Sequence, residues 1–270
     1  MASPILLPVS CSWSEYCAGT HYGSSALSDA LAMPLRQWAA AWLGGARYSG
    51  AASPAMIAGS ALDAILSGEP GKVFVSDTAT ITAKIKADNP GKFCVTADTF
   101  AEIQAGKEIA LIALHRVFGG EYQTQATYRG TIDGLDLQTR PDFVSVDGLV
   151  HLDLKYTAGK MLDQFERDFK WGNGHAKRYR IQTGLSRLSG AERVGFLLVE
   201  SGTETPRCRI AWIAEGEIRR CAREAVGAAD TVRDYLESTP EERRSLVVEE
   251  ITICNEYIDK LDAEEWSDDA

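Results

Sequence analysis

The chain has 270 residues, of which 45% are hydrophobic and 24% are charged, and its formal net charge at pH 7 is −10. This composition fits one large or two small globular domains, and no run of 18 apolar residues predicts a membrane span. The net negative charge argues against a protein that coats nucleic acid, because Lys and Arg drive phosphate binding. The six cysteines contain no C-x-x-C pair, which argues against a zinc ribbon or iron–sulfur cluster and fits reduced thiols in a cytoplasm.

Helices dominate the predicted N-terminal part of the chain, after an irregular segment over residues 1–23 that lacks the basic region of a signal peptide. One helix starts at Ser24 or Ser25 and is interrupted at Pro34, a second runs over residues 35–43, and a third runs from Pro54 until Gly68 stops it. Asp63 lies inside the apolar third helix. It is either exposed to solvent, as acids most often are, or a buried functional group.

Strands dominate the predicted middle of the chain. A short strand over 73–75, a loop over 76–96 and a helix over 100–118 capped by Thr99 lead to three β-prone runs. The runs are joined at Asp133-Gly134 and Asp147-Gly148, which predicts an antiparallel meander, although Pro141 removes a ladder donor from the first pair. The runs cover residues 122–132, 135–146 and 149–156; the later elements are helices over 161–169, 175–188, 215–236 and 240–244 and strands over 194–199 and 207–213.

The Asp147-Gly148 pair favours a two-residue type I′ turn, and this turn fixes a register. If these are the two turn residues, Asp142 lies opposite Asp153, with Cβ atoms roughly 4.5–5.5 Å apart. Lys155 points to the same face as Asp153, because alternate residues of a strand share a face. Two carboxylates at such a short distance repel each other unless a proton or a cation lies between them.

Magnesium suits such a pair, since it takes oxygen ligands and typically uses one or two carboxylates together with a substrate phosphate. The neighbouring lysine could orient or deprotonate water, or neutralise charge on the phosphate. A basic belt supports this interpretation: residues 155–193 contain nine Lys or Arg against four acids. The alternatives are a surface hairpin with a solvated Asp–Lys ladder and an ordinary solvated helical face.

Four short motifs occur in a characteristic order: Gly59–Asp63, Arg140–Asp142, Asp153–Lys155 and Tyr179–Gln182. This set resembles the PD-(D/E)xK nuclease superfamily, and within it the RecE-type (exodeoxyribonuclease VIII) and RecB-like exonucleases of phages and prophages. The resemblance covers roughly residues 20–240. It implies an α/β fold with a restriction-endonuclease-like core, in which helices flank a central mixed sheet that carries the antiparallel catalytic meander. It also implies one nuclease domain over 1–240, with a helical region at about 24–68, and a C-terminal extension with an acidic tail over 241–270.

The resemblance further implies roles for individual residues. Asp142 and Asp153 would be ligands of Mg²⁺ or Mn²⁺, with the carbonyl of Leu154 as a third ligand, and Lys155 would be the catalytic lysine. Tyr179 and Gln182 match the helix that contacts DNA near the scissile phosphate and supports the lysine. The DNA contacts expected from the basic belt are Lys170, Lys177, Arg178 and Arg180.

The chain departs from the family pattern at two positions. Asp63 stands where these enzymes usually have a histidine that completes the metal site, and a carboxylate there remains a good ligand for Mg²⁺ or Mn²⁺. An acidic residue that usually precedes the meander has no clear counterpart. Glu121 is the nearest acid, and Gln123 and Gln125 are neutral alternatives.

As a function, the resemblance implies a metal-dependent exonuclease that resects duplex DNA ends 5′→3′ for recombination. It also implies a homo-oligomer in the cytoplasm of a bacterial host cell, working with a single-strand annealing recombinase. Two alternatives stay open: a structure-specific or single-strand endonuclease on the same core, and a binding protein whose active site has lapsed. The four histidines form no ligand spacing, and His151, on the face of Asp153, is expected to be a packing group.

Overall fold

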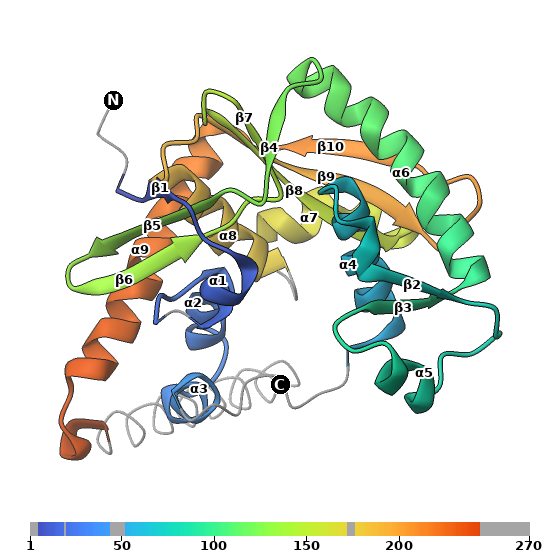
Figure 1. Ribbon diagram of the computed structural model, residues 1–270. Coiled ribbons are helices and arrows are strands. Elements are labelled where there is room, and N and C mark those ends of the chain that lie inside the picture. The colour runs from blue at the N-terminus through green and yellow to red at the C-terminus, as the bar shows by residue number, and fades with distance from the viewer. Residues whose placement is uncertain (1–4, 19, 44–51, 172–175, 244–270) are drawn as a thin grey trace, which may run out of the picture.

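The computed structural model describes residues 5–18, 20–43, 52–171 and 176–243 and has a mixed α/β fold (Figure 1). Its centre is a five-stranded sheet in the order β10-β9-β8-β7-β4, in which β8 and β9 run parallel and the other neighbours run antiparallel. The predicted fold class, a mixed sheet flanked by helices, is confirmed. The strands of this sheet are β4 (Tyr122–Thr124), β7 (Phe143–Ser145), β8 (Val150–Ala158), β9 (Arg193–Ser201) and β10 (Cys208–Trp212).

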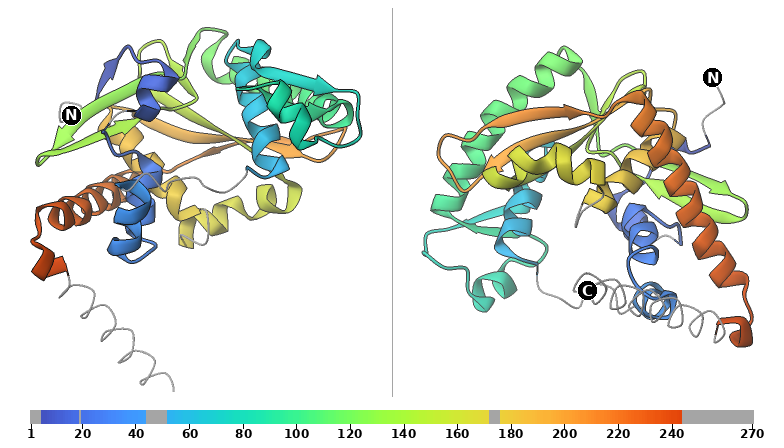
Figure 2. Two further views of the ribbon diagram at one scale, coloured as in Figure 1. Left: turned by 60° about the horizontal axis from the view of Figure 1, so that its bottom comes forward. Right: turned by 180° about the vertical axis from the view of Figure 1, so that it is seen from behind.

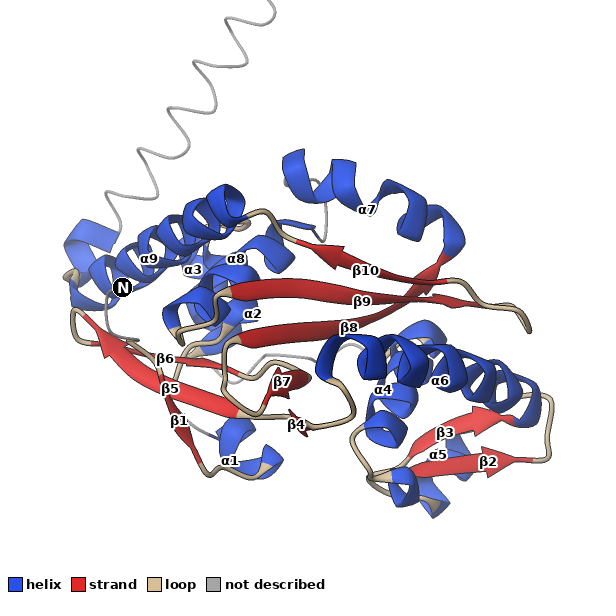
Figure 3. Ribbon diagram, turned by 90° about the horizontal axis from the view of Figure 1, so that it is seen from above, coloured by secondary structure: helices blue, strands red, loops and turns tan. Residues whose placement is uncertain are grey.

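Helices cover both faces of the central sheet (Figure 3). On one face, α4 and α6 pack on a core that includes Leu152 and Leu154 of β8; on the other, α7 and α8 pack near Phe196 of β9. Because successive strand residues point to opposite faces, Asp153 and Lys155 lie on the side of α8. The helices are α4 (Pro54–Leu66), α6 (Ala97–Phe118), α7 (Gly159–Trp171), α8 (Ala176–Leu188) and α9 (Glu215–Glu237), of which α9 packs along α8.

A second, three-stranded antiparallel sheet in the order β1-β5-β6 lies beside the first. Its core is shared with the N-terminal helices and α9, and contains the fully buried Trp38, whose Nε1 donates to the carbonyl of Ala26 at 2.9 Å. The helices on either side of Pro34 are confirmed. The irregular N-terminal segment was a wrong prediction, because it contains β1, which pairs with β5, and α1. These elements are β1 (Leu7–Val9), α1 (Trp13–Ala18), α2 (Ser24–Ala30), α3 (Leu35–Trp42), β5 (Thr127–Ile132) and β6 (Leu135–Thr139).

The predicted single meander is divided between the two sheets. The run over 122–132 breaks at Gln125, whose φ is 57°, and the run over 135–146 breaks at Arg140-Pro141, where the proline cannot donate to a ladder. The two breaks lie side by side, since Gln125 N donates to the carbonyl of Asp142 at 3.0 Å. The chain therefore changes sheet at both points. Between them, Asp133 and Gly134 form the predicted joint between β5 and β6, and their φ values of 46° and 87° are those of a type I′ turn.

The register of the second hairpin is confirmed, although its turn is not of the predicted type. Phe143 lies opposite Leu152 and Val144 opposite His151, which is the register that places Asp142 beside Asp153. Only Gly148 of the turn has a positive φ, 75°, and the loop between the strands comprises residues 146–149. A four-residue loop centred on the same pair as a two-residue turn leaves the register unchanged.

The segment 76–96 was wrongly predicted as a loop. It holds a helix and a strand that pairs in parallel with the strand expected over 73–75, which extends to Ser76, and Figure 2 shows this small pair with α4 and α6 at one side of the fold. Helix α6 starts earlier than predicted, since Thr96 rather than Thr99 is its cap and its Oγ1 accepts from Thr99 N at 3.2 Å. The additional elements are a 3₁₀ turn (Pro70–Lys72), β2 (Val73–Ser76), α5 (Ala83–Asp88) and β3 (Phe93–Thr96).

Most of the C-terminal extension lies outside the described residues; of the helix expected over 240–244, residues 240–243 are helical. In the part of the chain that the structure describes, no helix is long and apolar enough to cross a membrane.

Candidate active site

Asp142 and Asp153 lie next to each other at the point where the chain enters the central sheet. The register of β7 and β8 places the two residues opposite each other, and Oδ2 of Asp142 accepts from Leu154 N at 2.6 Å. Asp153 is only 4% exposed. The hairpin register predicted from the sequence thus brings the two acids together, and the backbone of β8 holds Asp142 in place.

Asp63 of α4 faces this pair. The amide Nε2 of Gln125 donates to both oxygens of Asp63, at 2.9 and 3.0 Å, and to Oδ1 of Asp142 at 3.3 Å. Arg140 Nε donates to Oε1 of Gln125 at 3.0 Å, which fixes the orientation of the amide because only its oxygen can accept. The exposed alternative for Asp63 is wrong, since α4 packs on β8 and this side chain points from the helix into the acidic cluster.

The environment favours protonation of these three acids. Burial, followed by the charge of Asp142, raises the pKa of Asp63 to about 7. Burial also raises the pKa of Asp142, against the opposing effect of Lys155, and raises the pKa of Asp153 well above its ordinary value. Three buried acids that cannot all ionise at neutral pH form a site that gains stability from a bound cation.

Lys155 supplies a positive charge beside the pair. Its Nζ lies 3.9 Å from Oδ1 of Asp153, donates to Oε1 of Gln182 at 3.3 Å, and lies 4.9 Å from the ring centroid of Tyr179. Burial opposes its charge, but Asp153 and Asp142 outweigh burial and raise the pKa of Lys155. The ammonium is therefore the form present at neutral pH, so this lysine donates hydrogen bonds and is not a base.

The donor set fits a hard divalent cation. No three side chains of His, Cys, Asp or Glu among the described residues are already arranged to hold a metal. Mg²⁺ does not require three, because it uses one or two carboxylates and completes its shell with waters and substrate phosphate. Asp142, Asp153 and the carbonyl of Leu154 are oxygen donors of this kind. A cavity of about 390 Å³, lined by Asp63, Asp142, Leu154 and Tyr156 among others, opens beside them.

Arg180 is not placed to contact DNA, which corrects the prediction. The residue is 4% exposed, and its guanidinium forms a two-point ion pair with Glu224. Its Nη1 also donates to the carbonyls of Phe169 and Lys170, at 3.2 and 3.1 Å, at the end of α7. Arg180 therefore joins α7, α8 and α9 as a buried structural group.

Two of the other residues predicted to contact DNA, Arg178 and Lys170, are accessible to solvent. The side chain of Arg178 is 42% exposed and pairs with Asp29 at 3.0 Å. Lys170 Nζ lies 5.6 Å from the ring centroid of Trp171, which is 69% exposed. The side chain of Lys177 lies outside the described residues.

The structure places Gln125, and not Glu121, at the acidic cluster. Glu121 is exposed and forms no described contact with the three aspartates, whereas Gln125 bridges two of them. The sequence indicates Gln125 only as a neutral alternative to Glu121, and Arg140 only as part of the Arg140–Asp142 motif. The signal that could have identified them is their position at the two strand breaks. His151 is 1% exposed and packs on Tyr128 with ring centroids 5.1 Å apart, as expected of a packing group.

No family model matches the sequence, and no curated protein matches it either. Among solved structures, the fold is similar to the crystal structure of a candidate exonuclease from Eubacterium rectale, with a TM-score of 0.56 and 17% sequence identity. The match covers 83% of this chain and 86% of the other. At this identity the likeness shows a common fold that extends over most of both chains.

Proposed function

We propose that this protein is a metal-dependent deoxyribonuclease of the PD-(D/E)xK type that hydrolyses phosphodiester bonds in DNA. The observation that carries the proposal is the β7–β8 register that places Asp142 opposite Asp153, with the Lys155 ammonium 3.9 Å from Asp153. The shared fold with a candidate exonuclease supports it.

Mg²⁺ or Mn²⁺ bound at this pair would polarise the scissile phosphate and lower the pKa of the attacking water. Asp142 is oriented for this role by the amide of Leu154. Because burial raises the pKa of both acids, a cation at the pair would compete with a proton for the carboxylate oxygens. Lys155, held by Gln182, donates a hydrogen bond to phosphate oxygens on which negative charge grows in the transition state. Tyr179 packs under the ammonium and limits its motion.

The finer proposal is an exonuclease that acts 5′→3′ on duplex ends, of the RecE-like kind found in phages and prophages. The order of the four motifs supports it. Arg178 and Lys170, both accessible on the side of α7 and α8, are the proposed contacts to the DNA backbone, together with Lys177. A homo-oligomer and a single-strand annealing recombinase as partner belong to the same proposal.

The test uses a linear duplex labelled at one 5′ end, incubated with the full chain and Mg²⁺ or Mn²⁺. Two matched variants, Asp153→Asn and Lys155→Met, keep the size of the side chain and remove its charge. We expect end-dependent release of label by the wild type, and at least a 10³-fold lower rate in either variant, on the order of a lost charge-stabilising group. A covalently closed plasmid tests for endonuclease action, because an exonuclease needs an end.

Mn²⁺ titration calorimetry separates chemistry from metal binding. The wild type should bind Mn²⁺, Lys155→Met should retain binding, and Asp153→Asn should lose it. Absence of hydrolysis together with absence of Asp153-dependent Mn²⁺ binding would contradict the proposal and favour a lapsed site.

A further inference from the structure

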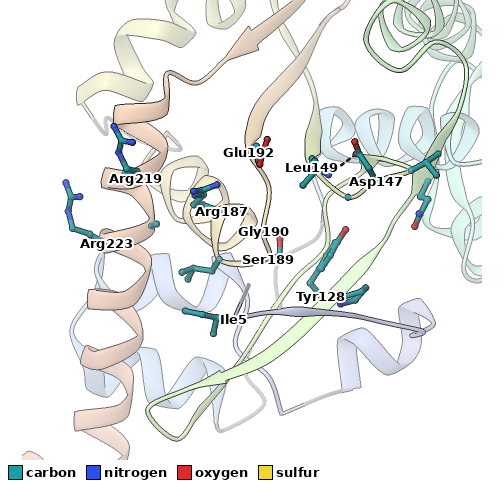
Figure 4. Close-up of a pocket in the computed structure, with 16 residues that line it drawn as sticks. Ile5, Tyr128, Asp147, Leu149, Arg187, Ser189, Gly190, Glu192, Arg219 and Arg223 are labelled. Atoms are coloured by element: carbon teal, nitrogen blue, oxygen red, sulfur yellow. Dashed lines mark hydrogen bonds between the residues drawn. The ribbon is translucent and has the colours of Figure 1, made fainter. Parts of the chain in front are cut away.

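A second and larger cavity, of about 710 Å³, shares no lining residue with the cavity beside the acidic cluster. Figure 4 shows the residues that line it. It is bounded by the end of α8, by α9, by the loop between β7 and β8, and by the N-terminal strand. Leu149 in its wall precedes β8, and Asp153 lies four residues further along the strand, or about 13 Å. The volume is in the range of pockets that hold small ligands, roughly 300–1,000 Å³.

Three arginines define one side of this cavity, which we call the arginine wall: Arg187 of α8 and Arg219 and Arg223 of α9. Arg219 and Arg223 are four residues apart and therefore share a helix face. Arg187 Nη1 donates to the carbonyl of Ala191 at 2.8 Å, which anchors the side chain. Arg219 pairs with Glu215 one turn earlier on α9, whereas Arg187 and Arg223 have no ion pair with any residue that the structure describes. The charge of these two arginines is therefore available to an anionic group.

Hydrogen-bond acceptors line the rest of the cavity. Asp147 lies on the far side from Arg219 and Arg223, and Glu192 lies between them (Figure 4). Oδ1 of Asp147 accepts from Ser145 Oγ at 2.5 Å and from Leu149 N at 3.0 Å, and these bonds lower the pKa of Asp147. The carboxylate is thus ionised and fixed, and its second oxygen can accept from a ligand. The cavity therefore has a cationic side and an anionic side.

Apolar side chains complete the lining. Ile5 is 44% exposed, Val146 is 62% exposed and Leu149 is 38% exposed, so each presents apolar area to the cavity. An organic ligand body would cover these surfaces and release about 25 cal/mol for each Å² of apolar area that it removes from water.

We propose that this cavity binds a nucleoside phosphate. The phosphate would lie on the arginine wall, the sugar and the base would cover Ile5, Val146 and Leu149, and the amino or imino groups of the base would donate to Asp147 or Glu192. This assignment uses both signs of charge, because a nucleotide has an anionic end and a donor-rich end. An acidic peptide fits less well, since Asp147 and Glu192 repel it. The site does not depend on the proposed nuclease activity.

Isothermal titration of the full chain in EDTA tests the proposal without hydrolysis, so a failure of the proposed nuclease function would not affect it. The probes are dAMP, adenosine, inorganic phosphate, a dA₆ oligonucleotide and a peptide with the sequence of residues 259–270. We expect dAMP to bind, and Arg223→Gln and Arg187→Gln each to weaken it about tenfold, as for one lost charge-assisted contact. Arg220→Gln is the matched control, because it removes an exposed arginine of α9 that does not line the cavity, and it should leave binding unchanged.

Tighter binding of dA₆ than of dAMP would identify a DNA strand as the source of the nucleotide, and equal binding would identify a free mononucleotide. Three results would overturn the proposal: no binding of dAMP or dA₆ at millimolar concentration, equal affinity for inorganic phosphate and dAMP, or binding of the acidic peptide in place of the nucleotides. An equal loss of affinity in Arg220→Gln and Arg223→Gln would overturn it as well, because the effect would then be one of overall charge.

Discussion

Replacing Arg180 with methionine distinguishes a structural arginine from a DNA contact. The change keeps the aliphatic part of the side chain and removes a guanidinium that is 5% exposed. It leaves Glu224, which is 33% exposed, without its buried partner, and it leaves the carbonyls of Phe169 and Lys170 without a donor. Breaking such a pair from one side costs about 3–5 kcal/mol. In a domain of this size, the loss corresponds to a fall in Tm of roughly 8–15 °C.

Two further arginines serve as controls for this experiment. Arg220→Met removes a second, exposed arginine that contacts Glu224 at 3.4 Å and should cost less than about 1 kcal/mol. Arg178→Met should also have a small effect on stability, because its pair with Asp29 is half-exposed. DNA affinity is measured by fluorescence anisotropy of a labelled duplex in EDTA, at one salt concentration and below the lowest Tm. Arg178→Met should weaken DNA binding several-fold, whereas Arg180→Met should leave it within about twofold.

The opposite pattern would refute the reasoning. If Arg180→Met kept the wild-type Tm and lost DNA affinity tenfold, the guanidinium would have to leave Glu224 for DNA, and the sequence-based assignment would be right. A loss of Tm as large in Arg220→Met as in Arg180→Met would show that burial does not decide the strength of these pairs.

In metal-free buffer, the free energy of unfolding of the wild type should fall by about 3 kcal/mol between pH 5 and pH 7.5, relative to that of Asp63→Asn. The reason is that Asp63, with its pKa of about 7, keeps a proton in the folded chain that the unfolded chain has already released. Urea unfolding curves with the same pH dependence for both proteins would contradict this. Burial lowers the pKa of His151 to about 4, so on acidification the unfolded chain takes up a proton before the folded chain does. Between pH 6.5 and pH 4 the wild type should therefore lose about 3 kcal/mol of unfolding free energy in the same urea assay, and His151→Leu should not show this loss. Gln125→Ala should weaken Mn²⁺ binding and lower the proposed activity without unfolding the chain, since the amide bridges Asp63 to Asp142; unchanged calorimetry would count against a positioning role. Gly184→Ala in α8 should lower the free energy of unfolding by about 3 kcal/mol, because the added Cβ would overlap the carbonyl of Cys221 on α9. Gly227→Ala in α9, where the added Cβ meets open space, should raise it by about 0.5–1 kcal/mol; thermal melts measure both changes. Destabilisation by both substitutions would contradict the packing of α8 on α9.

The sequence predicted those features that local chemistry determines. The Asp133-Gly134 turn formed as expected, because Asp and Gly both tolerate the positive φ that a type I′ turn requires. The register that pairs Asp142 with Asp153 was correct although the Asp147-Gly148 turn has a different geometry, since both geometries are centred on the same two residues. The helices of the described chain were found by their apolar period, except where they were short.

The features that the sequence did not predict depend on distant partners. Strand β1 and strand β3 have four or fewer residues and are stabilised by pairing with β5 and β2, so no local pattern marks them. Asp63 shows what could have been inferred. The buried residues of α4 lie on several sides of the helix, so an acid within it has little solvent to face and must meet a polar partner. Arg180 could not be told from its neighbours by charge, because its partner Glu224 lies 44 residues away.

Two strand breaks assemble the site, and the meander prediction anticipated an irregularity only at Pro141. A continuous strand through Gln125 or through Arg140 would direct alternate side chains to fixed faces of one sheet and would keep Asp142 in a ladder. The breaks instead let the chain pass from one sheet to the other, so Asp142 approaches the backbone of Leu154 and Gln125 turns towards Asp63. The bond from Arg140 to Gln125 then connects both breaks to α4. In the Arg140-Pro141-Asp142 motif, the proline therefore ends one sheet, the arginine orients the amide and the aspartate enters the acidic cluster, which explains why the change of sheet and the candidate active site coincide in the fold.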